Sequence, residues 1–146
     1  DMVGPYGYCA DISRTFVEGR KLSNYQNKIH SLAYENVKYN EQLIKTGVSF
    51  REFAEKAWQL PDNCFDNHYP CQIHGVGMSD EWPFIAYPNE DYSNGDYSGA
   101  FEENMVVCVE SYIGEVGGNE GAKLEDQYLV TDKGLKLLSS IPLNLV

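Results

Sequence analysis

The segment YPCQIHGVGMSDEW, residues 69–82, is the stretch around which the rest of the chain is organised. It places His74 against two glycines and ahead of two adjacent carboxylates, Asp80 and Glu81. Its glycines, proline and serine are typical of turns, so we expect an irregular conformation around the histidine. Long irregular stretches inside compact domains are usually functional, and His74 is therefore a candidate site residue.

Four further acidic residues can complete a metal site with His74. Asp1 and Asp11 precede the segment, and Glu110 and Glu125 follow it. The two glutamates lie inside β-rich, largely apolar runs, VVCVES and KLEDQY, where a carboxylate is costly to bury unless it is paired or bound to metal. Four carboxylates and one imidazole are the ligand set of two divalent cations, with iron or manganese favoured and cobalt or zinc possible. Five unrelated, solvated charges would fit this pattern poorly.

The composition restricts the class of protein and its partners. A chain of 146 residues with 42% hydrophobic and 13% aromatic residues fits one folded domain, residues 1–146. The net charge of −11 argues against nucleic acid or an anionic membrane as partner, because phosphate binding requires clustered Lys and Arg. No apolar run approaches the roughly 18–20 residues of a membrane span. We therefore expect a soluble protein.

The cysteines and the first residue bear on compartment and assembly. Cys9, Cys64, Cys71 and Cys108 show no CxxC spacing, so we expect buried thiols in a reducing cytoplasm, with Cys9 and Cys108 inside strands as small apolar residues. The chain begins at Asp1 without an initiator methionine, which we interpret as the carboxyl-terminal part of a longer chain. An exposed strand edge seldom stays unpaired, so we predict either a homodimer or pairing with the rest of that longer chain.

The first half of the sequence predicts two strands and two helices. Residues 2–18 are rich in Val, Tyr, Cys and Ile and are broken by glycine and proline, which favours two strands joined by a tight turn. Residues 23–46 carry apolar side chains at three- and four-residue intervals, with Ser23 as a possible N-cap, and predict a long amphipathic helix. A capping box at Ser49 predicts a second helix, which Pro61 ends.

The second half predicts a loop, a hairpin and a short helix. Residues 61–99 repeat Asn, Asp, Gly, Pro and Tyr and are expected to be loop-like. Residues 105–116 and 122–131 are β-rich runs joined by a glycine-rich turn, which predicts a hairpin with its two glutamates side by side. A final short helix is expected over residues 133–139.

Four of these segments together resemble a known enzyme family. The runs DMVGPYGYCADISRTF, HGVG, ENMVVCVES and KLEDQ resemble the metal-binding half of the pita-bread fold shared by methionine aminopeptidase, Xaa-Pro dipeptidase, aminopeptidase P and creatinase. The resemblance implies an α+β partial domain, with a curved antiparallel sheet and flanking helices. It also implies that the metal ligands are Asp1, Asp11, His74, Glu110 and Glu125, with Asp11 and Glu125 bridging.

Two departures shift the resemblance toward one branch of the family. Position 81 is glutamate where the prolyl peptidases have a second histidine, and Asp1 and Asp11 are ten positions apart, one fewer than in those peptidases. Both features resemble the dimethylsulfoniopropionate lyase branch. That branch implies that Asp80 is the catalytic base and that Tyr69 is a mobile catalytic residue at the substrate.

The lyase interpretation is chemically consistent with the remaining residues. Asp80 can remove the proton next to the substrate carboxylate while dimethyl sulfide leaves and acrylate forms. A sulfonium cation prefers aromatic faces, so Trp82, beside Glu81, is a candidate substrate-binding residue, although it could equally fill the core. The alternative is an Xaa-Pro dipeptidase or aminopeptidase that cleaves a short proline-containing peptide with a hydroxide between the metals. A non-catalytic binding or structural relative is the third possibility.

Overall fold

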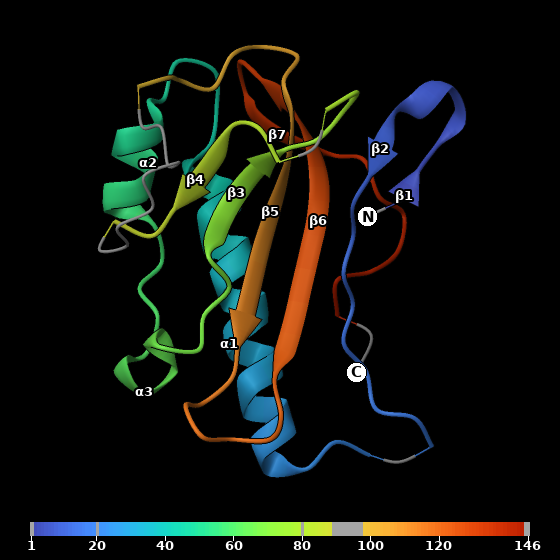
Figure 1. Ribbon diagram of the computed structural model, residues 1–146, viewed down its shortest axis with the longest axis vertical. Coiled ribbons are helices and arrows are strands. Elements are labelled where there is room, and N and C mark those ends of the chain that lie inside the picture. The colour runs from blue at the N-terminus through green and yellow to red at the C-terminus, as the bar shows by residue number, and fades with distance from the viewer. Residues whose placement is uncertain (1, 20, 80, 89–97, 145–146) are drawn as a thin grey trace.

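The computed structural model describes residues 2–19, 21–79, 81–88 and 98–144, and it is an α+β protein, as predicted (Figure 1). Its larger sheet has five antiparallel strands in the order β4-β3-β5-β6-β7. These strands are β3 (Cys71–Gly75), β4 (Phe84–Ala86), β5 (Val106–Ile113), β6 (Ala122–Thr131) and β7 (Gly134–Leu137).

The centre of this sheet is the hairpin of β5 and β6, which was predicted from the sequence. Glu110 is directly opposite Glu125 in its register, so the expected side-by-side placement of the two glutamates is confirmed. On the other side of β5, strand β3 pairs His74 with Cys108. The register therefore brings residues from three distant parts of the chain to the middle of one sheet.

A long helix covers one face of the sheet. Helix α1 (Asn24–Asn40) begins at Ser23, whose side chain accepts a hydrogen bond from the Gln26 amide, while the Gln26 side chain accepts one from the Ser23 amide. Figure 1 shows α1 running behind β3, β5 and β6. The side chains buried between helix and sheet form the main core, namely Ile29, Ala33, Val37, Ile73, Val107, Val109, Ile113, Leu124, Tyr128 and Val130.

A small hairpin lies beside the sheet and carries Asp11. Its strands β1 (Met2–Val3) and β2 (Cys9–Ala10) are joined by a short 3-10 turn. The prediction of two strands joined by a tight turn is therefore confirmed, although both strands are short. After β2 the chain runs along β6, where Ser13 and Glu125 exchange backbone hydrogen bonds. This contact holds the segment that follows Asp11 against the strand that carries Glu125.

Two short helices complete the described structure. Helix α2 (Phe50–Lys56) begins where predicted, because the Ser49 hydroxyl accepts a hydrogen bond from the Glu52 amide 3.0 Å away. It packs Phe50 and Phe53 edge-on against Phe101. Helix α3 (Asp62–Phe65) follows it. The second predicted helix is therefore present but ends several residues before the expected proline.

Three expected boundaries are wrong. Residues 61–99 are not simply loop-like, because they contain α3, β3 and β4. The sequence of β3 does alternate apolar Cys71 and Ile73 with polar Gln72 and His74, but over only five residues and among turn-forming residues, so its pairing with β5 decides its conformation. The helix predicted over 133–139 is strand β7, which extends the β5–β6 hairpin by pairing with β6. The helix predicted over 23–46 becomes a 3-10 turn at Glu41–Leu43, after which Ile44 is extended and enters the core.

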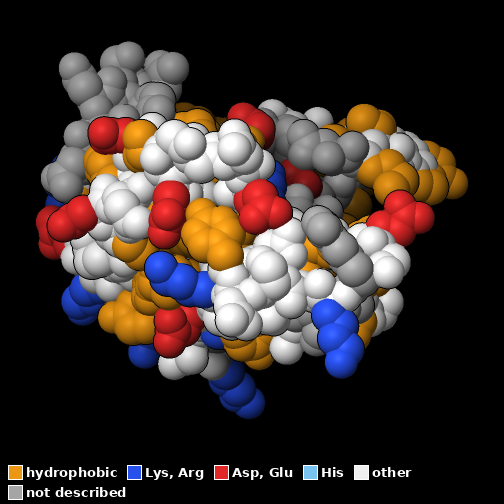
Figure 2. Space-filling model, turned by 90° about the horizontal axis from the view of Figure 1, so that it is seen from below, with side chains coloured by type: hydrophobic (Ala, Val, Ile, Leu, Met, Phe, Trp, Pro, Cys, Tyr) orange, Lys and Arg blue, Asp and Glu red, His pale blue; other side chains and the backbone are white. Residues whose placement is uncertain are grey.

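The lower face of the molecule is mixed in character. Seen from below, acidic, basic and apolar side chains are interspersed over the described residues (Figure 2). None of the helices in the described part of the chain combines the length and the hydropathy that a membrane span requires.

Candidate metal centre

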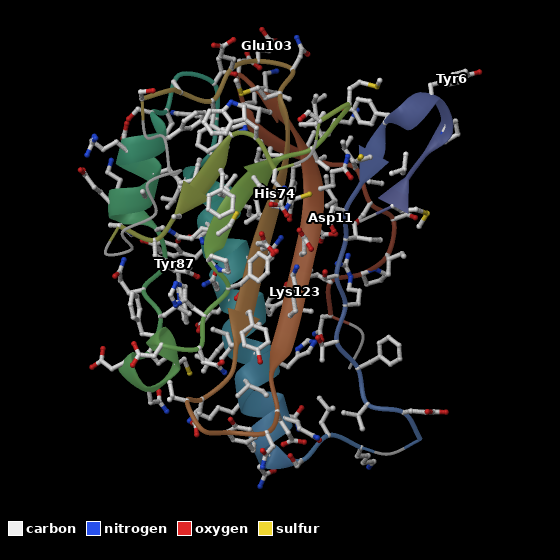
Figure 3. The ribbon with its side chains drawn as sticks, in the orientation of Figure 1. Tyr6, Asp11, His74, Tyr87, Glu103 and Lys123 are labelled. Carbon is white, nitrogen blue, oxygen red and sulfur yellow. The ribbon has the colours of Figure 1, made fainter. Side chains whose placement is uncertain are left out.

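Adjacent residues of β3, β5 and β6 point to opposite faces of the sheet. Val109 and Leu124 face α1 and belong to the core, whereas their neighbours Glu110 and Glu125 point to the other face. Figure 3 shows the labelled side chains of Asp11, His74 and Lys123 gathered over these strands, on the side away from α1. Because successive side chains of a strand point to opposite faces, this alternation is sufficient to separate the polar cluster from the apolar core.

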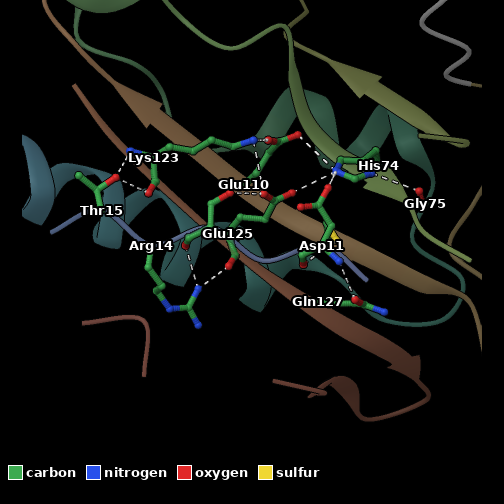
Figure 4. A network of polar contacts seen from close by, with 11 residues as sticks. Asp11, Arg14, Thr15, His74, Gly75, Glu110, Lys123, Glu125 and Gln127 are labelled. Atoms are coloured by element: carbon green, nitrogen blue, oxygen red, sulfur yellow. Dashed lines mark hydrogen bonds and ion pairs between the residues drawn. The ribbon is translucent and has the colours of Figure 1, made fainter. Parts of the chain in front are cut away.

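Four predicted ligands converge on this face. His74 Nε2 lies 3.1 Å from Glu125 Oε1, 3.6 Å from Glu110 Oε1 and 3.7 Å from Asp11 Oδ2. Figure 4 shows the three carboxyl groups and the imidazole directed at one another. Relative exposure is 5% for Asp11, 3% for His74, 1% for Glu110 and 0% for Glu125. Such a concentration of buried acidic groups requires compensation by positive charge.

The imidazole of His74 provides part of that charge in the absence of metal. Nδ1 lies 3.2 Å from the Gly75 carbonyl, to which it can donate, and Nε2 is directed at the carboxylates. Burial lowers the pKa of His74, but the hydrogen bond to Glu125 and the charge of Glu110 outweigh burial and raise the pKa to about 9. A proton on Nε2 therefore occupies the nitrogen that a metal ion would use.

Glu125 is the best-supported carboxylate of the cluster. The Ser13 hydroxyl donates to Glu125 Oε2 over 2.7 Å, while Oε1 faces His74. Burial raises the pKa of Glu125, but the hydrogen bonds from His74 and Ser13 and the charge of Lys123 outweigh it and lower the pKa to about 2. Glu125 is thus held ionised, as a metal ligand must be.

Lys123 is a second, half-buried cation at the cluster, and it was not predicted. Its Nζ lies 3.0 Å from Glu110 Oε2 and 3.4 Å from Glu125 Oε2, and 4.3 Å from the centre of the Tyr69 ring. Burial lowers the pKa of Lys123, but the charges of Glu110 and Glu125 outweigh burial and raise the pKa above its ordinary value. The ammonium therefore stays charged. Each glutamate therefore has one oxygen near His74 and one near Lys123.

Asp11 and Glu110 differ from Glu125 in the direction of their pKa shifts. Asp11 is positioned by its own amide, which donates to Gln127 Oε1 over 3.1 Å. Burial, followed by the charge of Glu125, raises the pKa of both Asp11 and Glu110. Within the part of the chain that the structure describes, Glu110 Oε1 is buried without a hydrogen-bond partner. Three carboxylates, one imidazole and an unsatisfied buried oxygen fit the coordination of a divalent cation.

Not every predicted site residue can be placed in this cluster. Tyr69 is half-buried and its ring lies against the Lys123 ammonium, and burial, with the charge of Glu110, raises its pKa. Glu81 and Trp82 are exposed on the connection between β3 and β4. Asp1 and Asp80 lie outside the described residues.

The expectation of an irregular segment around His74 is wrong at the histidine itself, which lies on β3. The irregular part begins after Gly75, and that glycine is required there. A Cβ atom at position 75 would lie 1.9 Å from the Trp82 carbonyl oxygen, so a larger residue would push the returning chain away from β3. The glycine therefore permits β4 to pair closely with the strand that carries His74.

The sequence interpretation missed residues whose roles depend on the register. Cys108, expected only as a small apolar residue in a strand, lies in that strand but also in the cluster: its Sγ and one donor atom each of Asp11, His74 and Glu125 all lie within 4.8 Å of one another. The signal for Cys108 and Lys123 was available, because each lies two positions from a predicted glutamate ligand and hence on the same face of its strand.

Comparison with known proteins agrees with this site. Residues 1–132 match the model of metallopeptidase family M24. The chain belongs to metallopeptidase family M24. Members of a metallopeptidase family bind divalent metal ions, which fits the buried donors of this M24 chain.

Relatives of this M24 chain include both lyases and peptidases. Dimethylsulfoniopropionate lyase DddP of Roseovarius nubinhibens is 39% identical over 144 residues, which cover 97% of this chain and 32% of that protein. The Xaa-Pro dipeptidase of Pyrococcus furiosus is 28% identical over 137 residues, 90% of this chain and 36% of that protein. The chain spans about a third of the length of the curated relatives it matches.

Solved structures confirm the expected pita-bread fold. The prolidase from Pyrococcus horikoshii OT3 superposes with a TM-score of 0.74 at 27% identity, over 95% of this chain and 38% of that one. The X-Pro aminopeptidase from Thermotoga maritima MSB8 superposes with a TM-score of 0.72. The structure thus corresponds to part of the fold of those enzymes.

Proposed function

We propose that the protein is a metal-dependent enzyme that cleaves dimethylsulfoniopropionate into dimethyl sulfide and acrylate. The observation that carries this proposal is the 39% identity to a dimethylsulfoniopropionate lyase over a segment that includes the whole buried cluster. Glu81 supports it, because it stands where the resemblance to prolyl peptidases would require a second histidine. The substrate class is then a small zwitterion with a carboxylate and a sulfonium group.

The cations would be held by Asp1, Asp11, His74, Glu110 and Glu125. Two ions are proposed because the two facing glutamates present four oxygens in different directions, and the excess of oxygen donors favours iron or manganese. Bound divalent cations would bind the substrate carboxylate and acidify the neighbouring C–H bond.

The residues of the chain would then perform the elimination. Asp80 accepts the proton from the carbon next to the carboxylate, the electrons of that C–H bond form the double bond of acrylate, and the C–S bond breaks to release dimethyl sulfide. The exposed aromatic face of Trp82 suits the sulfonium cation. Lys123 repels that cation from the buried end of the site, which orients the carboxylate inward.

The second candidate function is hydrolysis of Xaa-Pro dipeptides. It is favoured by the 28% identity to an Xaa-Pro dipeptidase and by the fold shared with prolidases. The same metal ligands would serve it, but Asp80 would have no part in proton removal from carbon. The two functions therefore differ in the role of one residue that is not a metal ligand.

An Asp80→Asn variant tests the proposal. Loss of a general base should reduce acrylate formation by roughly 10² to 10⁴-fold, while the metal content measured by mass spectrometry stays unchanged. Asp132→Asn, an exposed aspartate in the turn between β6 and β7, is the matched control and should keep full activity. Glu110→Gln should abolish turnover under either function.

Peptidase activity would give the opposite ranking. Hydrolysis of Xaa-Pro dipeptides without release of dimethyl sulfide, and only a small effect of Asp80→Asn on that hydrolysis, would overturn the lyase proposal. Measuring both substrates with the same metal-loaded sample makes the comparison independent of the metal content.

A further inference from the structure

The thiol of Cys108 is a soft donor atom in the candidate metal centre. Its Sγ lies with donor atoms of Asp11, His74 and Glu125 in a group whose members are all within 4.8 Å of one another. Ligand atoms that share one ion at bond lengths of roughly 2.0–2.3 Å can be separated by little more than 4 Å, so the group is almost small enough to bind an ion as it stands.

The backbone holds this thiol at the site. Cys108 is paired with His74 on β3 and with Gln127 on β6, so it lies in a central strand with hydrogen-bonded neighbours on both sides. It has the same parity along β5 as Glu110 and therefore points to the same face. The side chain is fully buried, and its Sγ lies 3.5 Å from the Asp11 carbonyl oxygen.

A second observation indicates that the cluster is built for a cation. Glu110 is 1% exposed, and its Oε1 is directed at His74 without a hydrogen-bond partner among the described residues. A buried carboxylate oxygen left in this state is stabilised by an ion that binds next to it. The thiol and this oxygen lie on the same face of β5, two positions apart in the strand.

We propose that Cys108 contributes a sulfur donor to the ion held by Asp11, His74 and Glu125, and that it shifts the metal preference of this position toward thiophilic ions. On binding, the thiol proton is released to solvent and the sulfur binds as thiolate. Thiolate favours zinc, cobalt, cadmium and ferrous ions over manganese and magnesium, which prefer oxygen. The inference rests on the metal site of the proposed function but not on the identity of its substrate.

The prediction can be tested with cobalt. Co²⁺ bound to the wild-type protein should show a thiolate-to-cobalt charge-transfer band in the near ultraviolet, and Cys108→Ser should lose it while still binding cobalt. Cys64→Ser is the matched control, because Cys64 is likewise a buried cysteine but lies on α3, outside the cluster. That variant should keep the band.

Competition titrations provide a second readout. The preference of the protein for Cd²⁺ over Mn²⁺ should fall on the order of tenfold or more in Cys108→Ser, the scale of effect seen for groups that support metal ligands. Mn²⁺ affinity should change little. Circular dichroism shows which variants keep the native structure. If Cys108→Ser does not fold, Cys108→Thr replaces it in both the cobalt and the competition experiments.

The possible failures are distinguishable. Cobalt binding without a charge-transfer band in the wild type, or an unchanged band and unchanged metal preference in folded Cys108→Ser, would overturn the role of Cys108 alone. Failure of the wild-type protein to bind any divalent cation would instead overturn the metal site of the proposed function.

Discussion

The two faces of the β3–β5–β6 sheet differ in what they contribute, although they are built from alternate residues of the same strands. On the face toward α1, Val109 and Leu124 pack in the core, and removal of their apolar surface from water stabilises the fold. On the other face, their neighbours Glu110 and Glu125 form a charged cluster whose burial opposes folding. The face toward α1 thus stabilises the fold, and that stability offsets the cost of burying the charged cluster on the opposite face.

A buried carboxylate on each side shows how the difference can be recognised. Asp126, on the α1 side, is paired with Arg14 at 2.6 Å and accepts a hydrogen bond from Ser139 at 2.7 Å. Glu110, on the opposite side, is equally buried but has an oxygen without a hydrogen bond among the described residues. Burial alone does not distinguish these two carboxylates, whereas the completeness of their pairing does.

The largest effect is expected for a change on the core face. Leu124→Ala should lower the free energy of unfolding by about 2–5 kcal/mol, because it leaves a cavity against α1. Denaturant titration of the metal-free protein measures this loss. The fraction that remains folded should bind metal with unchanged stoichiometry. A reduced stoichiometry would show that the two faces are not independent.

The adjacent residue should show the reverse pattern. Glu125→Gln should weaken metal affinity by more than the roughly 10–100-fold that is typical for groups outside the ligand set, because it removes the carboxylate that faces both His74 and Lys123. The free energy of unfolding without metal should change less than in Leu124→Ala. Glu120→Gln, at the exposed end of the hairpin, is the control and should retain metal binding. Isothermal titration calorimetry measures these affinities.

A smaller effect is expected where a side chain acts on the cluster through Glu125. Ser13→Ala removes the 2.7 Å hydrogen bond to Glu125 Oε2 and should weaken metal binding by about tenfold, at the lower end of the range for such partners. Ser31→Ala, on the exposed side of α1, should have no effect on affinity. If both serine variants bind metal like the wild type, Ser13 serves only to attach its segment to β6.

The smallest effect concerns pH and the charge of His74. Its pKa is about 9 in the metal-free fold and has an ordinary value of 6.5, so protonation favours the folded state. This contribution should be complete below pH 6.5 and lost as the pH rises through 9. Metal affinity should increase over the same interval, because the ion and the proton compete for the imidazole.

Thermal unfolding of metal-free wild type and His74→Gln across that interval isolates the contribution of the imidazole. The stability difference between the two proteins should narrow as the pH rises. A difference that stays constant would show that His74 is not charged in the metal-free fold.

The sequence by itself determined the features that depend on short-range patterns. The start of α1 at Ser23, the start of α2 at Ser49 and the β5–β6 hairpin follow from capping residues and from residue types within one window of the chain. The order of acidic residues and histidine also indicated the family, because the ligand types of a metal site depend on the chemistry of the ion.

The tertiary structure alone decided the features that depend on pairing between distant segments. β3 and β7 alternate apolar and polar residues over only five and four positions, so their hydrogen bonds to β5 and β6 decide that they are strands. Cys108 and Lys123 join the cluster because the register places them beside His74 and Glu110, respectively. The physical reason is that the residues next to a position in the sequence determine its backbone preference. Its charge environment is determined instead by neighbours that the fold brings from elsewhere in the sequence.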